Sequence, residues 1–177
     1  MDEDDALMKR AKGGDTSAFD AIVRRHQHRL QRFAIRMAGG DAALGADVAV
    51  GAFLRLWEGR ATYRPQGTLG AWLLRTAYRL VVDEVRRRRA HGTLDGLSDG
   101  DSLLLRVERT ALAQAVRDAI VDLPEGHRAV VVLSVYEGLS QDAIAEILDV
   151  PSGTVASRKN HALKTLRRRL AAWDEPR

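Results

Sequence analysis

The sequence predicts an all-α protein made of two small helical domains, and three observations support this fold class. Apolar residues recur at helical spacing, and glycine, proline and small polar residues separate these segments as they do at helix ends. The nearest approach to a strand, Val130-Val131-Val132-Leu133, lies inside a segment of helix length. Aromatic residues make up only 5% of the chain, so aliphatic helix packing is expected.

Four helices are expected in the first domain, residues 1–89. A loop, Gly59–Gly67, separates the third of these helices from the fourth. Leu54 is one of the apolar residues that predict the third helix. Residues 90–102 are rich in Gly, Asp and Ser, which predicts a flexible acidic linker. The four expected helices cover about Asp4–Lys12, a segment from Thr16 to Met37, about Asp41–Glu58, and Thr68–Arg89.

The second domain, residues 103–177, is expected to hold four helices that include a helix-turn-helix. Pro124 suits the first position of a helix, and Gly138 suits a helix C-terminus. Ser140 and Ser152 are good N-caps for the two helices of the helix-turn-helix. The expected helices cover a segment from about 103, then 124–137, 140–148 and 153–170.

Positive charge gathers in two segments of a chain whose net charge is +4. The segment from Thr154 to Leu170 contains six basic residues and no acidic one. Residues 64–89 contain seven basic residues against Asp83 and Glu84, so the rest of the chain is acidic. This pattern predicts two contacts along one polyanion. The linker is expected to be a spacer, with shielding of the basic segments in the absence of DNA as the alternative.

Several kinds of site are not expected. The absence of cysteine excludes disulfides and thiolate metal sites. His26-Gln27-His28 is not expected to bind a metal, because residues two apart point to different helix faces. No enzymatic activity, cofactor or membrane insertion is predicted, since the chain lacks a phosphate-binding loop, a paired nucleophile and base, and an apolar run of membrane length. The acidic N-terminus does not read as a signal peptide, so a cytoplasmic protein is expected.

Blocks of sequence in both domains have the order and spacing of a known family: Phe53–Trp57, Ala71–Leu73, Asp83 with Arg86–Arg89, Asp122–Pro124, Gly138–Ser140, Ile144–Leu148 and Gly153–Arg158. With these blocks the chain resembles the extracytoplasmic-function (ECF) group of bacterial RNA polymerase sigma factors, in the sigma-70 family. The resemblance covers roughly 18–89 and 107–170, and it implies that the first domain binds the polymerase clamp and helps to open the promoter's −10 element. It implies that the second domain binds the −35 element and the polymerase flap, and that an anti-sigma factor is a further partner.

The resemblance also assigns residues to three surfaces. Unstacked bases need aromatic groups and a cationic groove, and the −10 side offers Tyr63, Arg64, Trp72, Arg75, Arg79, Arg86, Arg87 and Arg88. The −35 side comprises Ser140, Gly153, Thr154, Ser157, Arg158, Lys159, Asn160, His161 and Lys164. The polymerase-binding residues are Asp47, Val50, Gly51 and Arg55. Trp72 also fits a core position, on one apolar stripe with Leu69 and Leu73.

The chain departs from the family pattern at Val50-Gly51, where relatives usually have a polar-acidic pair. Ala156 stands where Lys or Arg is usual, Arg79 where Asn is common and Lys159 where the residue is commonly apolar. The leading hypothesis is a promoter-specificity subunit of polymerase. The first alternative is a sigma-like decoy that binds a sigma regulator without engaging polymerase. The second is a two-domain repressor, for which the sequence offers no dimer interface or effector pocket.

Overall fold

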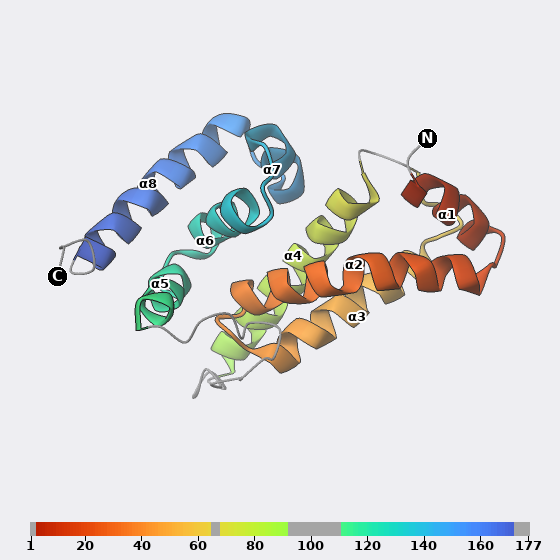
Figure 1. Ribbon diagram of the computed structural model, residues 1–177, viewed down its shortest axis with the longest axis horizontal. Coiled ribbons are helices and arrows are strands. Elements are labelled where there is room, and N and C mark those ends of the chain that lie inside the picture. Colours follow the sequence, from red (N-terminus) through yellow and green to blue (C-terminus); the bar gives the residue numbers. More distant parts are fainter. Residues whose placement is uncertain (1–2, 65–67, 92–110, 172–177) are drawn as a thin grey trace.

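The structure is a computed structural model that describes residues 3–64, 68–91 and 111–171. These residues form helices without a strand, so the all-α prediction is confirmed (Figure 1). The first half contains α1 (Glu3–Lys12), α2 (Thr16–Met37), α3 (Ala42–Glu58) and α4 (Leu69–Ala90). The second half contains α5 (Ala111–Val121), α6 (Glu125–Val131), η2 (Val132–Tyr136), α7 (Gln141–Leu148) and α8 (Ser152–Leu170).

Polar side chains fix where three helices of the first half begin. Asp15, Asp41 and Thr68 each accept a hydrogen bond from a backbone N–H in the first turn of the helix that follows. These bonds satisfy donors that lack a partner within the helix. The helices then pack around fully buried apolar side chains, among them Phe33, Leu56 and Leu73.

A glycine allows α2 and α3 to cross closely. A Cβ atom at Gly45 would lie 2.3 Å from Cγ1 and 3.1 Å from the backbone nitrogen of Ile35. The first distance is shorter than real Cβ contacts and the second is tight, so a side chain at position 45 would require Ile35 to shift. This contact holds α3 in place and so positions its opposite, exposed face.

The helix-turn-helix is formed by α7 and α8. The Ser140 hydroxyl accepts the N–H of Ala143, which confirms the predicted N-cap. The predicted N-cap at Ser152 is wrong, because Pro151 takes that position and the Ser152 hydroxyl instead donates to Asp142 on α7. Asp149 makes the turn in the left-handed conformation (φ 56°), which a short polar side chain tolerates.

Two other predicted boundaries shift by a small amount. Pro124 is the N-cap of α6 and not its first residue, and the helix continues into η2 through a π-helical turn. Ala90, predicted to begin the linker, is the last residue of α4. The remainder of the predicted linker, from Gly92 onward, lies outside the described residues, so the proposed domain limits stay a prediction.

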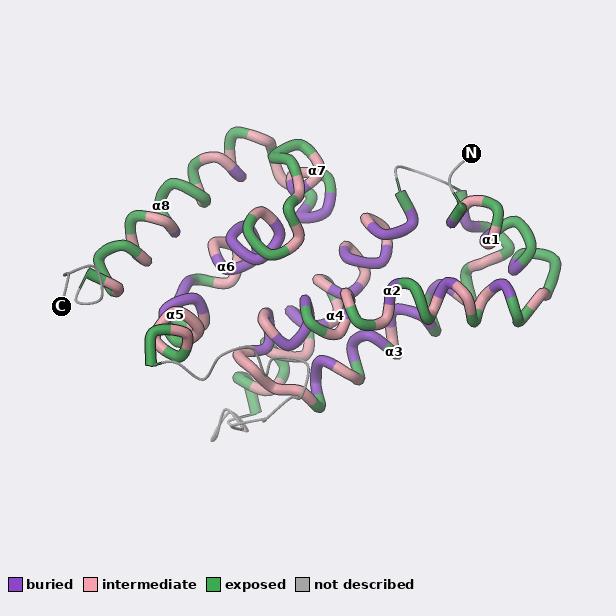
Figure 2. The backbone as a smooth tube through the Cα atoms, viewed as in Figure 1, coloured by how far each residue is buried: buried purple, intermediate pink, exposed green. Residues whose placement is uncertain are grey.

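The two halves contact each other, which the sequence does not indicate. Helix α4 packs against α7, and α2 contacts α6 and η2. Figure 1 shows α4 and the C-terminal end of α2 next to the second half. Val155 and Ala162 are the buried residues of α8. The rest of this helix is exposed or half-buried (Figure 2).

Candidate nucleic-acid and polymerase interfaces

Helix α8 exposes most of the residues predicted for the −35 side. Val155 and Ala162 face the core of the second half. The opposite face of α8 is therefore turned toward solvent. Thr154 and Arg158 are half-buried, and Ser140 is exposed although its hydroxyl caps α7. The exposed predicted residues on α8 are Gly153, Ser157, Lys159, Asn160, His161 and Lys164.

Arg158 lies against α6. A Cβ atom at Gly126 would be 2.9 Å from its Nη1, so the missing side chain at position 126 leaves room for this guanidinium. The charge of Arg158 also acts on Tyr78 of α4, where it lowers a pKa that burial raises above the usual tyrosine range. The contact of Arg158 with DNA stays a prediction, and in this structure its guanidinium lies against Gly126 of α6.

His161 is held in one orientation by two neighbours. Its Nδ1 lies 2.9 Å from the carbonyl oxygen of Ser157, and a carbonyl can only accept, so Nδ1 donates and the neutral ring keeps Nε2 as an acceptor. The ring of His127 on α6 meets it edge-on, with centroids 6.3 Å apart. Burial, and then the charges of Arg158 and His161, lower the pKa of His127.

The predicted −10 side is less uniformly exposed. Tyr63 is only 7% exposed, and its ring meets the edge of Trp72, with centroids 6.1 Å apart. Lys12 of α1 donates to the carbonyl of Tyr63, which ties this loop to α1. Arg64 and Arg79 are exposed, whereas Arg75 donates to the carbonyl of Glu146 on α7. DNA contact by Tyr63 stays a prediction, although the phenol is part of the core here.

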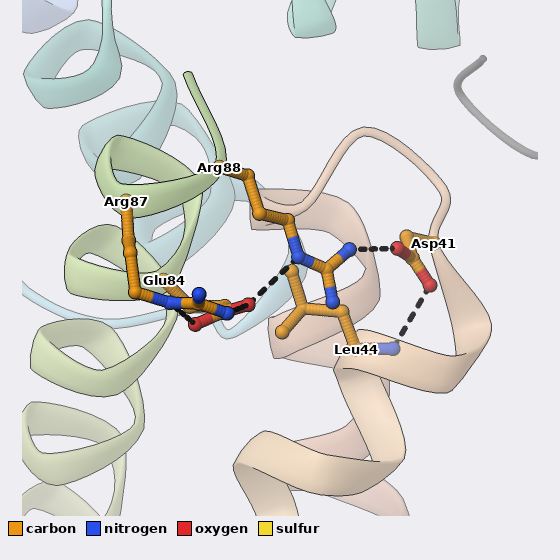
Figure 3. A network of polar contacts seen from close by, with 5 residues as sticks. All are labelled: Asp41, Leu44, Glu84, Arg87 and Arg88. Carbon is orange, nitrogen blue, oxygen red and sulfur yellow. Dashed lines mark hydrogen bonds and ion pairs between the residues drawn. The ribbon is translucent and has the colours of Figure 1, made fainter. Parts of the chain in front are cut away.

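The arginines that end α4 form ion pairs (Figure 3). Arg87 donates to both carboxylate oxygens of Glu84, at 2.7 and 2.8 Å. Arg88 bridges Glu84 and Asp41, each at 2.8 Å, while Asp41 also accepts the N–H of Leu44 at the start of α3. Arg88 therefore joins the end of α4 to the N-cap of α3, and it is a structural cross-link as well as a predicted phosphate contact.

Removing the Glu84 carboxylate should weaken this cross-link in a pH-dependent way. Hydrogen bonds from Arg87 and Arg88 lower the pKa of Glu84 from 4.5 to about 2. A lowered pKa adds stability that is fully present above about pH 4.5 and is lost as the pH falls toward 2. We expect Glu84→Gln to reduce the free energy of unfolding by about 1 kcal/mol at pH 7, and by progressively less between pH 4.5 and 3.

Urea unfolding of the wild type and Glu84→Gln at several pH values measures this difference. Glu146→Gln is the matched control, since its carboxylate is exposed and outside the network. A difference between wild type and Glu84→Gln that stayed constant from pH 7 to 3 would contradict the role of the charged carboxylate.

The predicted polymerase face is the exposed side of α3. Asp47 and Arg55 are exposed, and Val50 is 58% exposed. Leu54, predicted to belong to the apolar set of this helix, is instead 54% exposed beside them. Positions 47, 50 and 54 lie on one helix face by their spacing, which is the sequence signal that could have identified Leu54.

Gly51 does not lie on that exposed face. It is half-buried, and a Cβ atom there would lie 3.3 Å from Cδ1 of Leu80 on α4. The departure from the family pattern at this position therefore accompanies a close contact between α3 and α4. Its direct contact with polymerase stays a prediction.

Comparisons with known proteins match the two halves of the chain to two different family regions. Residues 22–91 match the model for sigma-70 region 2, and residues 113–166 match that for sigma-70 region 4. The ECF RNA polymerase sigma-E factor of Escherichia coli K12 is 32% identical, over 88% of this chain and 87% of its own. CnrH, solved in complex with the cytosolic domain of CnrY, is 28% identical with a TM-score of 0.75, covering 98% of this chain and all of that one.

A second solved structure has the same fold. The sigma factor RpoE of Bartonella quintana, solved in complex with the anti-sigma factor NepR, has a TM-score of 0.71 at 21% identity and covers 89% of this chain and 98% of its own. Together, the two family matches span most of the chain and follow each other in the order of its two halves. The chain belongs to the ECF group of the sigma-70 family of RNA polymerase sigma factors.

Proposed function

We propose that this sigma factor directs core RNA polymerase to its promoters by docking through the exposed face of α3 and contacting DNA through α4 and α8. The observation that carries the proposal is the pairing of an exposed apolar patch, Val50 and Leu54, with a strongly basic exposed helix on the other half. Exposed apolar side chains grouped on one face are typical of protein interaction sites.

The two DNA contacts differ in chemistry. A helix presented by a helix-turn-helix places its N-terminal residues against base edges in the major groove, and Ser157, Asn160 and His161 of α8 have the polar groups for that contact. Lys159 and Lys164 are assigned to phosphates, which position a protein without reading sequence. On the −10 side, Trp72 and the arginines of α4 would hold an opened strand. The polymerase supplies the catalysis.

An anti-sigma factor is proposed as a further partner, because CnrH and the Bartonella RpoE were both solved in complexes and the partner of RpoE is an anti-sigma factor. Among the described residues, no helix is both long and apolar enough to span a membrane. We propose a cytoplasmic location because the polymerase acts there.

Reconstitution with purified core polymerase tests the function directly. The full chain should bind the core and start transcription from a subset of a promoter library. Binding to DNA without any binding to core would support the repressor alternative, and failure to bind either would support the decoy. Gly51 lies close to Leu80, where a Cβ atom would require a small shift of that side chain, so packing offers an explanation of this glycine other than lost polymerase docking.

We expect Asn160→Ala to relax the preference at one position of the upstream element. Asparagine can form two hydrogen bonds with adenine, a contact worth roughly 1–3 kcal/mol of discrimination. Lys164→Ala should instead weaken all sequences about equally and reduce the salt slope by about one unit, because it removes one phosphate contact. Titration of the holoenzyme against a promoter library at several salt concentrations separates the two effects. Equal weakening of every sequence by Asn160→Ala would contradict its base-reading role.

A further inference from the structure

Two histidines of the second half lie together where α6 meets α8. The ring of His161 meets the ring of His127 edge-on, with centroids 6.3 Å apart. His161 is exposed on α8, whereas His127 is half-buried on α6. The guanidinium of Arg158 lies against Gly126, the residue before His127, and its charge acts on the His127 ring. The two rings therefore share a cationic environment at the side of the helix that is proposed to read DNA.

A backbone carbonyl fixes which nitrogen of His161 can gain or lose a proton. Nδ1 lies 2.9 Å from the carbonyl oxygen of Ser157, about one helical turn earlier on α8. The oxygen can only accept, so Nδ1 carries a hydrogen in both the neutral and the charged ring. Protonation therefore takes place at Nε2. This nitrogen is an acceptor when the ring is neutral and a donor when the ring is charged.

The neighbouring histidine does not compete for that proton. Burial first, and then the charges of Arg158 and His161, lower the pKa of His127. A lowered pKa means that the neutral form of His127 persists to a lower pH than is usual for a histidine. His127 therefore stays an uncharged aromatic ring beside His161 when the solution is made mildly acidic.

The other charged groups around His161 keep their charge in the range where histidines titrate. Arg158 and Lys164 are its neighbours on α8, about one turn away on either side. The carboxylates at the start of α6 and at the end of α5, Glu125 and Asp122, are paired with arginines. Histidine is the side chain whose charge ordinarily changes between about pH 5 and 8, so His161 is the group here that responds to mild acid.

The two forms of Nε2 match opposite base edges. In the major groove, cytosine presents only a donor, its amino group, whereas guanine presents only acceptors, O6 and N7. A neutral His161 can accept a hydrogen bond from cytosine, and a charged His161 can donate one to guanine. Ser157 and Asn160, the other residues proposed to contact base edges, both donate and accept at every pH. A change of preference with pH is therefore expected from His161 alone among the three.

We propose that His161 is a specificity-determining residue that selects cytosine in the upstream promoter element when its ring is neutral and guanine when its ring is charged. This inference rests on the proposed contact of α8 with the −35 element. The order in which the polymerase prefers its promoters then changes with pH, although neither the fold nor the set of DNA contacts changes.

Nitrogen NMR of the full chain, with isotope-labelled histidine, tests where the hydrogen lies. The ring signals that disappear in His161→Gln belong to His161. At about pH 8 these signals should show a protonated Nδ1 and an unprotonated Nε2. A neutral ring with its hydrogen on Nε2 would overturn the proposal, and this result does not depend on whether the protein binds promoters.

The base preference is measured with the full chain bound to core polymerase, against a library of upstream elements. The position that His161 contacts is the one at which His161→Gln changes the preference. At that position the wild type should favour C·G over G·C by about fivefold near pH 8 and the reverse near pH 6, as expected for one hydrogen bond gained or lost. The ratio is informative because added positive charge strengthens the binding of both sequences alike.

Three variants assign the response to one side chain. His161→Gln should make the ratio independent of pH, because a glutamine side chain does not titrate. His28→Gln is the matched control, since it removes an exposed histidine of α2, and it should keep the response of the wild type. His127→Phe leaves an aromatic ring beside His161 and should also keep the response.

The possible outcomes separate this proposal from the proposed function. A wild-type ratio that is the same at both pH values would overturn the proposal. Tighter binding of every sequence in mild acid, with a steeper salt dependence and an unchanged ratio, would place the charged ring on a phosphate and overturn base reading. Loss of the response in His127→Phe would overturn the assignment to His161. The absence of any promoter preference at either pH would instead overturn the proposed function.

Discussion

Replacing Asp47 by arginine is expected to lower the affinity for core RNA polymerase by about thirtyfold, as loss of a central interface residue typically does. Asp47 is exposed on α3, on the face that also exposes Val50 and Leu54. The reversed charge would face the polymerase without disturbing the core beneath, so the melting temperature should stay nearly unchanged. Equilibrium binding of labelled protein to purified core polymerase measures the loss.

Asp20→Arg is the matched control for this experiment. Asp20 is exposed on α2 in the same half, so the substitution makes the same change in net charge at another surface. Equal losses of affinity in the two variants would assign the effect to overall charge. That result would remove this face of α3 from the docking proposal.

Leu73→Ala is expected to destabilise the first half severely. The side chain is fully buried on α4, and leucine-to-alanine changes in a packed core cost about 2–5 kcal/mol because they leave a cavity. In a domain of this size, each kcal/mol lowers the melting temperature by about 4–8 °C. Thermal unfolding followed by circular dichroism should therefore show a fall of about 15 °C.

Leu54→Ala makes the same chemical change on the surface of the same half. Because Leu54 is 54% exposed, its truncation should alter the free energy of unfolding by less than about 0.5 kcal/mol. It should nevertheless weaken polymerase binding, so the two leucines are expected to show opposite patterns in the two assays. A large loss of stability in Leu54→Ala would place this side chain in the core after all.

Helix positions follow from local physics, and the sequence therefore predicted them well. The apolar repeat located each helix, and Ser140 marked a start because its hydroxyl can satisfy a backbone N–H of the first turn. The error at Ser152 has a tertiary cause. Its hydroxyl bonds Asp142 on the neighbouring helix, and a sequence gives no direct sign of that contact.

The partners of charged side chains could not be predicted in the same way. Arg86, Arg87 and Arg88 look equivalent in sequence, yet the fold gives each a different set of partners. Arg86 pairs with the other half, Arg87 pairs on its own helix, and Arg88 pairs both on its own helix and at the N-cap of α3. Long side chains reach whichever carboxylate the tertiary structure brings near. The apolar pattern could not identify Leu54 as exposed either, because an interaction surface and a core surface look alike in a single sequence.

The contact between Gly51 and Leu80 has a consequence for how this protein can evolve. A Cβ atom at position 51 would lie 3.3 Å from Leu80, so Leu80 must shift before most larger residues fit there. The two positions are therefore coupled: a larger residue at position 51 requires the end of Leu80 to move by a few tenths of an ångström, and a smaller residue at position 80 would remove that requirement.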